Sequence, residues 1–216
     1  MSLPPHPDLQ IVSDEPVWTG RFPLHLVRFR NRRFDGAWSG TRTWELWHRG
    51  RAAAILPYDP VQDALVLTEQ FRLPALAAGV EPVMFEIPAG LCDEGEDPAA
   101  TARREAEEEA NLKVTALERI GGFVLSAGAS DERCTLFAGR IEAPAAGPDG
   151  LIGMGGLASE HEDIRVRRMP ASDAVARALA GEYPNAITSL ALLWLASRRD
   201  WLRERWRAAR PDSSSN

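Results

Sequence analysis

The segment from Gly90 to Leu112, GLCDEGEDPAATARREAEEEANL, constrains the fold more than any other part of the chain. It starts as an acidic loop that contains glycine and continues as a helical pattern. Asp97 followed by Pro98 predicts the start of the helix, because an aspartate side chain caps the first backbone N–H groups and proline suits the first helical position. The pattern continues to about Ala110. We therefore expect a helix directly behind an acidic loop.

Three glutamates share one face of this helix. Glu105 lies three and four residues before Glu108 and Glu109, and side chains at those spacings are neighbours, with Cβ atoms roughly 5–6 Å apart. Like charges there repel by a few tenths of a kcal/mol per pair, and a divalent cation would relieve the repulsion. Carboxylate oxygens are hard ligands that suit Mg²⁺ or Mn²⁺, and such sites also accept substrate phosphates. The pattern favours a metal site for phosphate chemistry, and the alternative is a solvated acidic helix.

The residues around the helix also have a fixed spacing. Those that define it are Gly90, Glu96, Arg104, Glu105, Glu108 and Glu109. The spacing resembles the box of the Nudix hydrolases. One position departs from the family pattern, since Asn111 stands where the family has a closing glycine. Asparagine is the commonest other residue at a left-handed helix C-cap, so the backbone that the box needs is available.

The resemblance implies roles for the box residues. Glu105 and Glu109 are the expected metal ligands, with the carbonyl of Ala89 as an additional ligand. Glu108 is the next candidate, and we assign it to catalysis. Arg104 is expected to be a structural partner that holds a box carboxylate in position.

The composition is that of an ordinary globular protein, with 44% apolar and 26% charged residues among 216. The net charge of −6 and the pI near 5.3 disfavour a nucleic-acid or anionic membrane surface, because both need a basic footprint. We see no signal peptide and no apolar stretch as long as a membrane span. Without a secretory signal, Cys92 and Cys134 are expected to be free thiols. We therefore expect a cytoplasmic protein with a small-molecule substrate.

Short apolar and alternating segments predict strands before and after the acidic helix. The predicted strands are residues 22–30, 41–50, 52–59, 64–72, 83–90, 114–126, 132–143 and 164–170. Helices are expected over 171–182 and 185–206, the second with Ile187, Leu190, Trp194 and Trp201 on its apolar face. We expect loops over 73–82 and 145–162 and a disordered tail over 211–216.

Strands and helices in this order give an α/β fold. The span from about Phe22 to Trp206 resembles the ADP-ribose pyrophosphatase subgroup of the Nudix hydrolases, including its RTWE, LPYDP, EQFR and SAGASDE segments. The resemblance implies an α/β/α sandwich over residues 49–210, preceded by a small antiparallel β domain over residues 1–48. It also implies a homodimer whose subunits exchange the N-terminal sheet.

Arg72, at the end of the EQFR segment, is a candidate phosphate ligand. A guanidinium offers planar, bidentate donors that suit a diphosphate, and the matching arginine in the subgroup contacts substrate phosphate. The alternative is an ordinary surface arginine at a strand end. Glu69 is a further candidate for the same site.

Trp44 and Glu45 in the RTWE segment are candidates for binding a nucleobase. A purine can stack on an exposed tryptophan for roughly 1–3 kcal/mol, and a carboxylate can accept from an exocyclic amine. The resemblance places both residues at the adenine end of the pocket, partly across a dimer interface, with Phe22 as a weaker candidate for the other side of the base. The alternative is packing in the core or an interface.

The SAGASDE loop supplies the candidate general base. Hydrolysis of a diphosphate needs a water and a carboxylate that accepts its proton, and glutamates that bind metal are poor bases. Glu132 aligns with the loop glutamate of the subgroup, Asp131 is its local rival, and Gly128 gives the loop freedom to close. Ala127 stands where the subgroup has a proline that marks ADP-ribose preference. The acidic stretch 160–163 could add a metal contact, although such stretches are more often solvated loops.

The resemblance implies hydrolysis of ADP-ribose to AMP and ribose 5-phosphate, with Mg²⁺ or Mn²⁺ as cofactor. One alternative keeps the enzyme class but changes the substrate to ADP-glucose, GDP-mannose or NADH. Another is a Nudix domain that senses ADP-ribose without cleaving it. The complete set of box glutamates disfavours a sensor, which needs no full metal site.

Overall fold

The computed structural model describes residues 3–208, which form two compact units. The first unit holds residues up to 51 together with the loop 124–133, and the second holds residues 52–123 and those from 134 onward. Each unit has its own sheet. The loop that carries Glu132 therefore belongs to the first unit, whereas the box belongs to the second.

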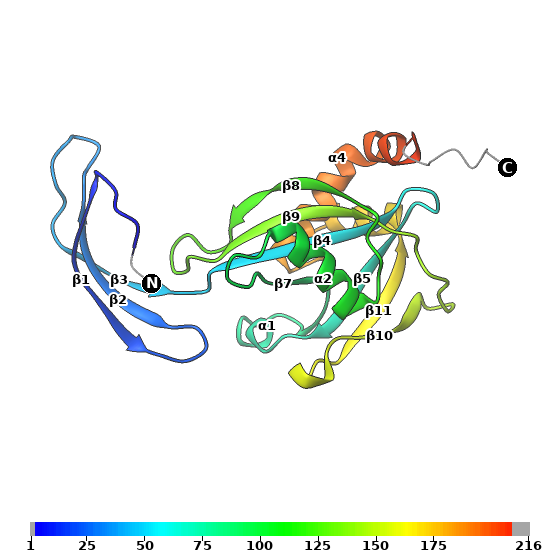
Figure 1. Cartoon of the computed structure of the whole chain (residues 1–216), viewed down its shortest axis with the longest axis horizontal. Helices are drawn as coiled ribbons and strands as arrows, with labels where there is room; N and C mark the ends of the chain where they lie inside the picture. The colour runs from blue at the N-terminus through cyan, green and yellow to red at the C-terminus, as the bar shows by residue number, and fades with distance from the viewer. Residues whose placement is uncertain (1–2, 209–216) are drawn as a thin grey trace. The chain divides into compact units, whose positions relative to one another are not determined.

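The sheet of the first unit has three antiparallel strands in the order β1-β2-β3, drawn in blue in Figure 1. They are β1 (Leu9–Trp18), β2 (Leu24–Asn31) and β3 (Arg42–Trp47). The last two were predicted, and β1 was missed. The reason is that β1 buries none of its residues fully, so its sequence lacks the alternation that identifies a half-buried strand.

The sheet of the second unit runs in the order β10-β11-β5-β4-β9-β8, with β6 paired to β5 and β7 paired to β4. The strands are β4 (Arg51–Asp59), β5 (Ala64–Phe71), β6 (Val83–Glu86), β7 (Ala89–Leu91), β8 (Ala116–Val124), β9 (Arg133–Arg140), β10 (Leu151–Gly155) and β11 (Ile164–Pro170). Almost every residue of β4 and β5 is buried, as expected for central strands covered on both faces.

Helices cover both faces of this sheet. They are α1 (Leu73–Ala77), α2 (Pro98–Ala110), α3 (Ala171–Leu179) and α4 (Ala186–Ala208). Leu56, Leu67 and Leu136 form one core cluster with residues of α3 and α4. Ile55 and Phe137 belong to a second cluster, built with the alanines of α2. This arrangement confirms the predicted α/β/α sandwich with a separate small antiparallel sheet.

Three local predictions were wrong. The loop expected over 73–82 contains α1, and the loop expected over 145–162 contains β10 and a single 3₁₀ turn at Ala158–Glu160. Glycine-rich β10 forms because it pairs with β11, a long-range contact that local sequence does not reveal. Trp201 is 39% exposed, and Leu195 and Leu202 occupy the buried face of α4 instead. The expected tail over 211–216 lies outside the described residues.

Two further expectations concern thiols and membranes. Neither Cys92 nor Cys134 forms a disulfide, as expected, and Cys134 is buried. None of the helices within residues 3–208 has the length and apolar character needed to cross a bilayer.

Candidate metal and phosphate site

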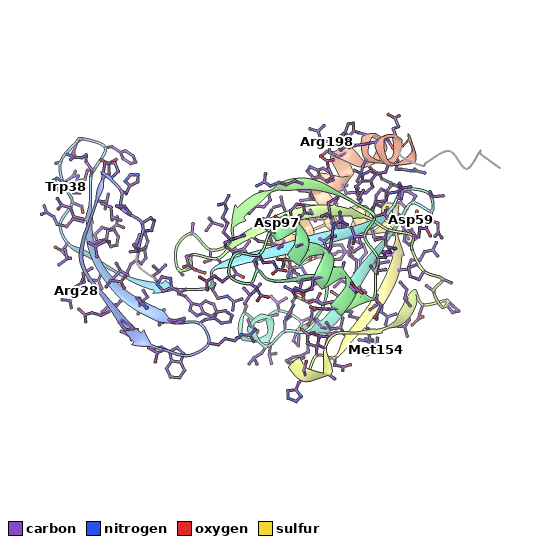
Figure 2. The ribbon with its side chains drawn as sticks, viewed as in Figure 1. Arg28, Trp38, Asp59, Asp97, Met154 and Arg198 are labelled. Carbon is purple, nitrogen blue, oxygen red and sulfur yellow. The ribbon has the colours of Figure 1, made fainter. Side chains whose placement is uncertain are left out.

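Helix α2 begins and ends where the sequence predicts. The side chain of Asp97 accepts a hydrogen bond from the backbone N–H of Ala99 at 3.3 Å, and Pro98 is the first helical residue. Figure 2 labels Asp97 at this end of the helix. Asn111 ends the helix in the left-handed conformation at φ 53°, ψ 39°. Asparagine thus supplies the backbone that glycine supplies in the family pattern, because it tolerates this conformation better than other side chains.

Glycine is required at position 90 because the carboxylate of Glu105 fills the space beside it. A Cβ atom at Gly90 would overlap both oxygens of that carboxylate. Glu105 is buried, and its burial raises the pKa of its carboxyl group. The loop and helix of the box therefore pack directly against each other.

Glu109 is the most buried glutamate of the box, with 4% of its surface exposed. One of its oxygens, Oε2, accepts a hydrogen bond from the backbone N–H of Ala89 at 3.2 Å. Burial raises the pKa of Glu109 to about 8, and the negative charges of Glu105 and Glu162 add to the shift. A buried carboxylate with this environment lacks a neutralising charge, which a bound cation would supply.

Arg104 links the outer carboxylates of the box. Its Nη1 lies 2.8 Å from Glu105 Oε1 and 2.8 Å from Glu108 Oε2. The same guanidinium contacts Glu96 and donates to the carbonyl of Leu91 at 3.1 Å. Hydrogen bonds from the Asp93 backbone and from Arg104 lower the pKa of Glu96 to about 2. The prediction that Arg104 is a structural partner of the box carboxylates is confirmed.

Glu162 belongs to the acidic stretch 160–163, for which the sequence analysis left open a metal contact or a solvated loop. Its negative charge contributes to raising the pKa of both Glu105 and Glu109. The backbone N–H of Leu157 donates to Glu162 Oε2 at 3.0 Å, and the N–H of Gly156 donates to the carbonyl of Glu108. The first bond lies within the 155–162 segment, and the second joins this segment to α2. The only sequence signal was an acidic stretch, which is too common to identify a ligand.

The residues at the box suit a hard divalent cation. No three acidic, histidine or cysteine side chains within residues 3–208 already form a closed metal cage. One reason is that Arg104 draws the oxygens of Glu105 and Glu108 toward itself. The donors are nevertheless all carboxylates, and Glu105 and Glu109 have raised pKa values that a cation would lower.

Arg72 lies in the same unit as the box, and its positive charge lowers the pKa of Glu109. Its Nε donates to Glu86 at 2.7 Å, and 42% of its side chain is exposed. Glu69, its expected companion, instead forms ion pairs with Arg165 and Arg167 at 3.1 and 2.8 Å. The charge of Arg72 thus acts on one box glutamate, Glu109, whereas Glu69 is ion-paired with two arginines of β11.

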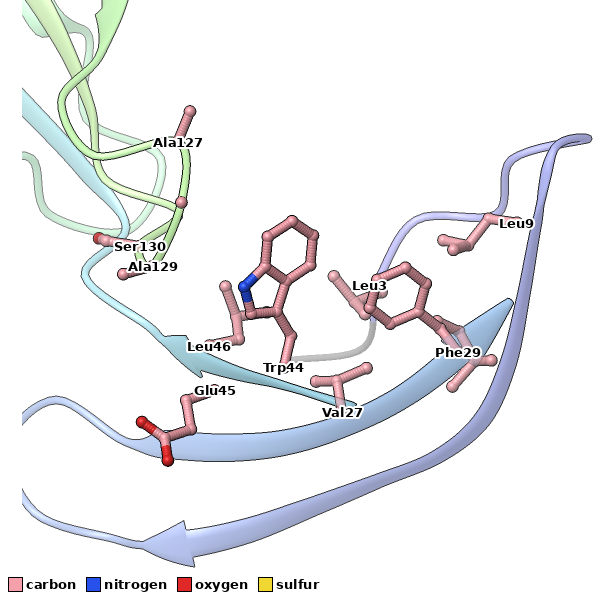
Figure 3. A pocket seen from close by; sticks show the side chains of 12 residues that line it. Leu3, Leu9, Val27, Phe29, Trp44, Glu45, Leu46, Ala127, Ala129 and Ser130 are labelled. Carbon is pink, nitrogen blue, oxygen red and sulfur yellow. The ribbon is translucent and has the colours of Figure 1, made fainter. Parts of the chain in front are cut away.

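Trp44 and Glu45 lie in the first unit, on β3. Trp44 is 46% exposed and stacks on Phe29 with ring centroids 5.6 Å apart. Figure 3 shows its indole in a cavity of about 230 Å³ that Val27, Glu45 and Ala127 also line, with the Glu45 carboxylate directed away from the indole. Neighbouring residues of a strand point to opposite faces, which explains why the side chains of Trp44 and Glu45 point in different directions.

Phe22 lines a different cavity of the first unit, of about 460 Å³, together with Trp18, Trp47 and Glu45. The ring of Phe22 meets that of Trp47 edge to face at 6.2 Å, and the guanidinium of Arg49 lies 4.0 Å from its centre. Within one chain, Phe22 and Trp44 therefore do not line the same cavity.

The two acidic side chains of the 124–133 loop, Asp131 and Glu132, differ in their hydrogen bonds. Asp131 accepts from the backbone N–H groups of Arg49 and Gly50 at 2.7 and 3.0 Å, and its other oxygen lies 2.7 Å from His48 Nδ1. Burial alone would raise the pKa of Asp131, but these hydrogen bonds together lower it. Among the residues that the structure describes, the carboxylate of Glu132 has only two contacts, both longer, at 3.4 Å to Arg49. Asp131 is thus tied into the fold, whereas Glu132 is held loosely.

Comparison with known proteins identifies the relatives of this arrangement. The NUDIX domain family matches residues 48–190. The chain is 38% identical to an ADP-ribose pyrophosphatase of Escherichia coli K12, over 92% of this chain and 93% of that protein. It is 34% identical to an ADP-ribose pyrophosphatase of Haemophilus influenzae, over 93% and 91% of the two chains. A GDP-mannose pyrophosphatase of Cronobacter sakazakii is 30% identical, over 88% and 96%.

A solved structure gives the same fold. The crystal structure of an ADP compounds hydrolase superposes with a TM-score of 0.65, covering 93% of this chain and 97% of that one. At 22% identity, this likeness concerns the fold alone.

Proposed function

The chain belongs to the NUDIX family and is a Nudix hydrolase, and from that premise we propose that it hydrolyses the diphosphate of ADP-ribose to AMP and ribose 5-phosphate. The observation that carries the proposal is the pair of buried glutamates on α2, Glu105 and Glu109, whose pKa values burial raises. The positive charge of Arg72 acts on Glu109. Support for the substrate comes from the relatives named ADP-ribose pyrophosphatase, which are 34–38% identical over most of the chain.

We assign the metal site to Glu105, Glu109 and the carbonyl of Ala89, with Glu162 as a further carboxylate. The cation in this proposal is Mg²⁺ or Mn²⁺, which would polarise a phosphate oxygen and lower the pKa of a bound water. Glu108 acts beside these ligands, within reach of Arg104. In this proposal α2 and Glu162 supply the carboxylates that would hold the cation.

The remaining roles concern phosphate binding and proton transfer. Arg72 binds a phosphate oxygen through its exposed guanidinium and stabilises charge as the P–O bond breaks. Glu132 accepts the proton of the attacking water, and its loose contacts with Arg49 leave it available for this role. Asp131 is disfavoured as the base, because both of its oxygens accept hydrogen bonds from the fold.

We further propose a homodimer in which residues 1–48 form an exchanged sheet and residues 49–210 form the Nudix domain. The first unit exposes several large apolar side chains, which is characteristic of an interaction surface. They include Ile11, Val12, Val17, Trp18, Trp44 and Trp47. The side chains of Trp44 and Glu45 leave β3 on opposite faces, and in this proposal the adenine lies partly across the interface between two subunits.

An alternative substrate is another nucleoside diphosphate sugar, because relatives named GDP-mannose pyrophosphatase are 30–34% identical to the chain. Ala127, which departs from the subgroup's proline, lines the Trp44 cavity, so it bears on the choice of base rather than on the chemistry. As to the location of the protein, we propose the cytoplasm, where cysteines such as Cys92 and Cys134 stay out of disulfides.

The test is release of AMP from ADP-ribose with and without Mg²⁺. We expect metal-dependent turnover that Glu109→Gln reduces at least about 100-fold, since it removes a charged ligand. Glu107→Gln is the matched control, because Glu107 is exposed on the same helix. Binding of ADP-ribose without turnover by the parent protein would indicate a sensor.

Two additions to the assay test the identity of the substrate and of the general base. A panel with ADP-glucose, GDP-mannose and NADH ranks the substrates by kcat/KM. Glu132→Gln, Glu160→Gln and Glu162→Gln compare the loop acids, and the base is the residue whose loss removes the acid limb of the pH–rate profile while metal affinity is unchanged.

A further inference from the structure

In one buried carboxylate outside the box, both oxygens accept hydrogen bonds from other side chains. Glu86, the last residue of β6, is 5% exposed. Its Oε2 accepts from Arg72 Nε at 2.7 Å, and its Oε1 accepts from Asn185 Nδ2 at 2.6 Å. A charge so deeply buried is stable only when it is paired and hydrogen-bonded. Glu86 therefore depends on both partners for its position.

The backbone around Glu86 is also fixed. In the pairing of β5 with β6, Glu86 lies opposite Thr68, whose hydroxyl donates to the carbonyl of Glu86 at 3.3 Å. The next N–H along the chain, that of Ile87, donates to the hydroxyl of buried Thr188 at 3.2 Å. The carboxylate is thus carried by a backbone held between the sheet and α4.

Asn185 is oriented by its position immediately before α4. Its side-chain oxygen accepts from the backbone N–H of Thr188 at 3.0 Å, which is the hydrogen bond of a helix N-cap. With the oxygen used in this way, the amide NH₂ is the end that faces Glu86. The start of α4 therefore determines which group meets the carboxylate.

Arg72 uses only part of its guanidinium for this contact. The Nε–H is taken by Glu86, and within residues 3–208 no other side chain or carbonyl bonds to its terminal nitrogen atoms. An arginine has five N–H donors, so four remain, arranged in the planar fork that matches phosphate oxygens. The exposed part of Arg72 is the part that can bind an anion.

One short segment connects this arginine to the metal site. Glu86 holds Arg72, and three residues later the N–H of Ala89 donates to Glu109. Between them, the carbonyl of Pro88 accepts from the N–H of Ile55 at 3.0 Å, so the segment is fixed to β4. The spacing between the guanidinium and the box carboxylates is therefore set by the backbone of residues 86–89.

We propose that Glu86 and Asn185 are positioning residues for Arg72, which hold its guanidinium so that the four terminal N–H groups face a diphosphate beside the box. The inference rests on the proposed function for the phosphate-binding role of Arg72. A pre-oriented guanidinium loses less conformational freedom when the anion arrives, so the pair should strengthen diphosphate binding. The competing explanation is that Glu86 and Arg72 form only a structural ion pair between β6 and the start of α1.

A double-mutant cycle separates the two explanations. The variants are Arg72→Ala, Glu86→Gln and the double variant, all in the full chain. Calorimetry with Mn²⁺ present gives the dissociation constant of α,β-methylene-ADP, a diphosphate that cannot be cleaved between its phosphates, and steady-state assays give KM and kcat for ADP-ribose. We expect Glu86→Gln to weaken binding and raise KM about tenfold with little change in kcat. In the Arg72→Ala background the same change should have an effect of less than twofold.

Controls address folding. Glu118→Gln disrupts a similar ion pair, with Arg205 at 3.2 Å, and should leave binding unchanged. Asn185→Ser keeps a capping oxygen for α4 but loses the NH₂ that reaches Glu86. Asn185→Ser should weaken binding of the analogue severalfold only when Arg72 is present. If Glu86→Gln fails to fold, this variant tests the positioning role in its place.

The outcomes are distinct. Two results overturn the inference. In the first, Glu86→Gln weakens binding of the analogue equally with and without Arg72. In the second, Glu86→Gln leaves binding unchanged although Arg72→Ala weakens it. Binding that depends on both residues in a protein that does not cleave ADP-ribose supports the inference and contradicts the proposed function. A parent protein that does not bind the analogue contradicts both.

Discussion

The buried glutamates of α2 show how single residues define the candidate site. Glu105 fits only because residue 90 has no side chain, and Glu109 is oriented by one backbone N–H. Arg104 balances the outer carboxylates, whereas Glu109 remains without a cationic partner at hydrogen-bond distance among the described residues. The charge that a cation would neutralise is therefore concentrated at the inner end of the box.

The first prediction concerns Gly90. Gly90→Ala should displace the Glu105 carboxylate, because the added methyl group would occupy its place. We expect metal-dependent turnover to fall roughly 10- to 100-fold, the usual consequence of moving a ligand out of position. Gly153→Ala is the matched control, since no atom lies within 4 Å of the added Cβ. Equal activity of the two variants would contradict the packing argument.

At the scale of elements, the limits of α2 are set by its capping residues. The β4–β5 turn is stabilised by a cluster of ion pairs and hydrogen bonds around Asp63. Asp97 and Asn111 begin and end the helix. Asp63, in the turn, has a positive φ of 55° and accepts from Tyr58 and Arg199, with Arg203 also in contact. The Tyr58 contact is local, whereas the two arginines join the β4–β5 turn to α4.

A second prediction follows for Asn111. Asn111→Gly should retain activity and change stability by less than about 1 kcal/mol, because glycine adopts the left-handed conformation freely. Asn111→Val should lose about 1–2 kcal/mol, because a β-branched residue is disfavoured there. Urea unfolding measures both, and a valine variant as stable as the parent would contradict the role of the C-cap.

The third prediction concerns pH. Burial of Asp63 would raise its pKa, but hydrogen bonds from Arg199 and Tyr58 outweigh it, so the pKa lies below the ordinary value. Asp63 therefore stabilises the fold above the pKa it has in the unfolded chain, and this contribution is lost as the pH falls through the lower folded pKa. Asp63→Asn should be less stable at pH 7 and less sensitive to acid between about pH 5 and 3.

Urea midpoints across this range provide the measurement. Asp200→Asn is the control, because Asp200 is exposed on α4. An Asp63→Asn variant with the same loss of stability on acidification as the parent would contradict the assignment.

Elements with strong local signals could be predicted from sequence, and those that depend on distant partners could not. The limits of α2 follow from Asp97, Pro98 and Asn111, which act locally. Strand β1 and strand β10 form mainly through pairing with β2 and β11, so their own sequences give weak signals. Glu162 joins the box only because its segment folds back onto α2, and this contact depends on the three-dimensional fold.

At the scale of the whole molecule, the fourth prediction is a homodimer. Sedimentation equilibrium should give twice the chain mass of 23.7 kDa, because the first unit exposes large apolar side chains that need a partner. Trp18→Asp, at a residue that is 65% exposed, should shift the equilibrium toward monomer. Val61→Asp, a control at an exposed position of the second unit, should not. A parent protein that remains monomeric at micromolar concentration would contradict the proposal.

The most direct test of the account is to locate manganese in crystals. Crystals of the full chain, soaked with Mn²⁺ and α,β-methylene-ADP, should show an anomalous difference peak in contact with the carboxylates of Glu105 and Glu109. A bound nucleotide with no such peak beside these two glutamates would contradict the assignment of the box as a cation site.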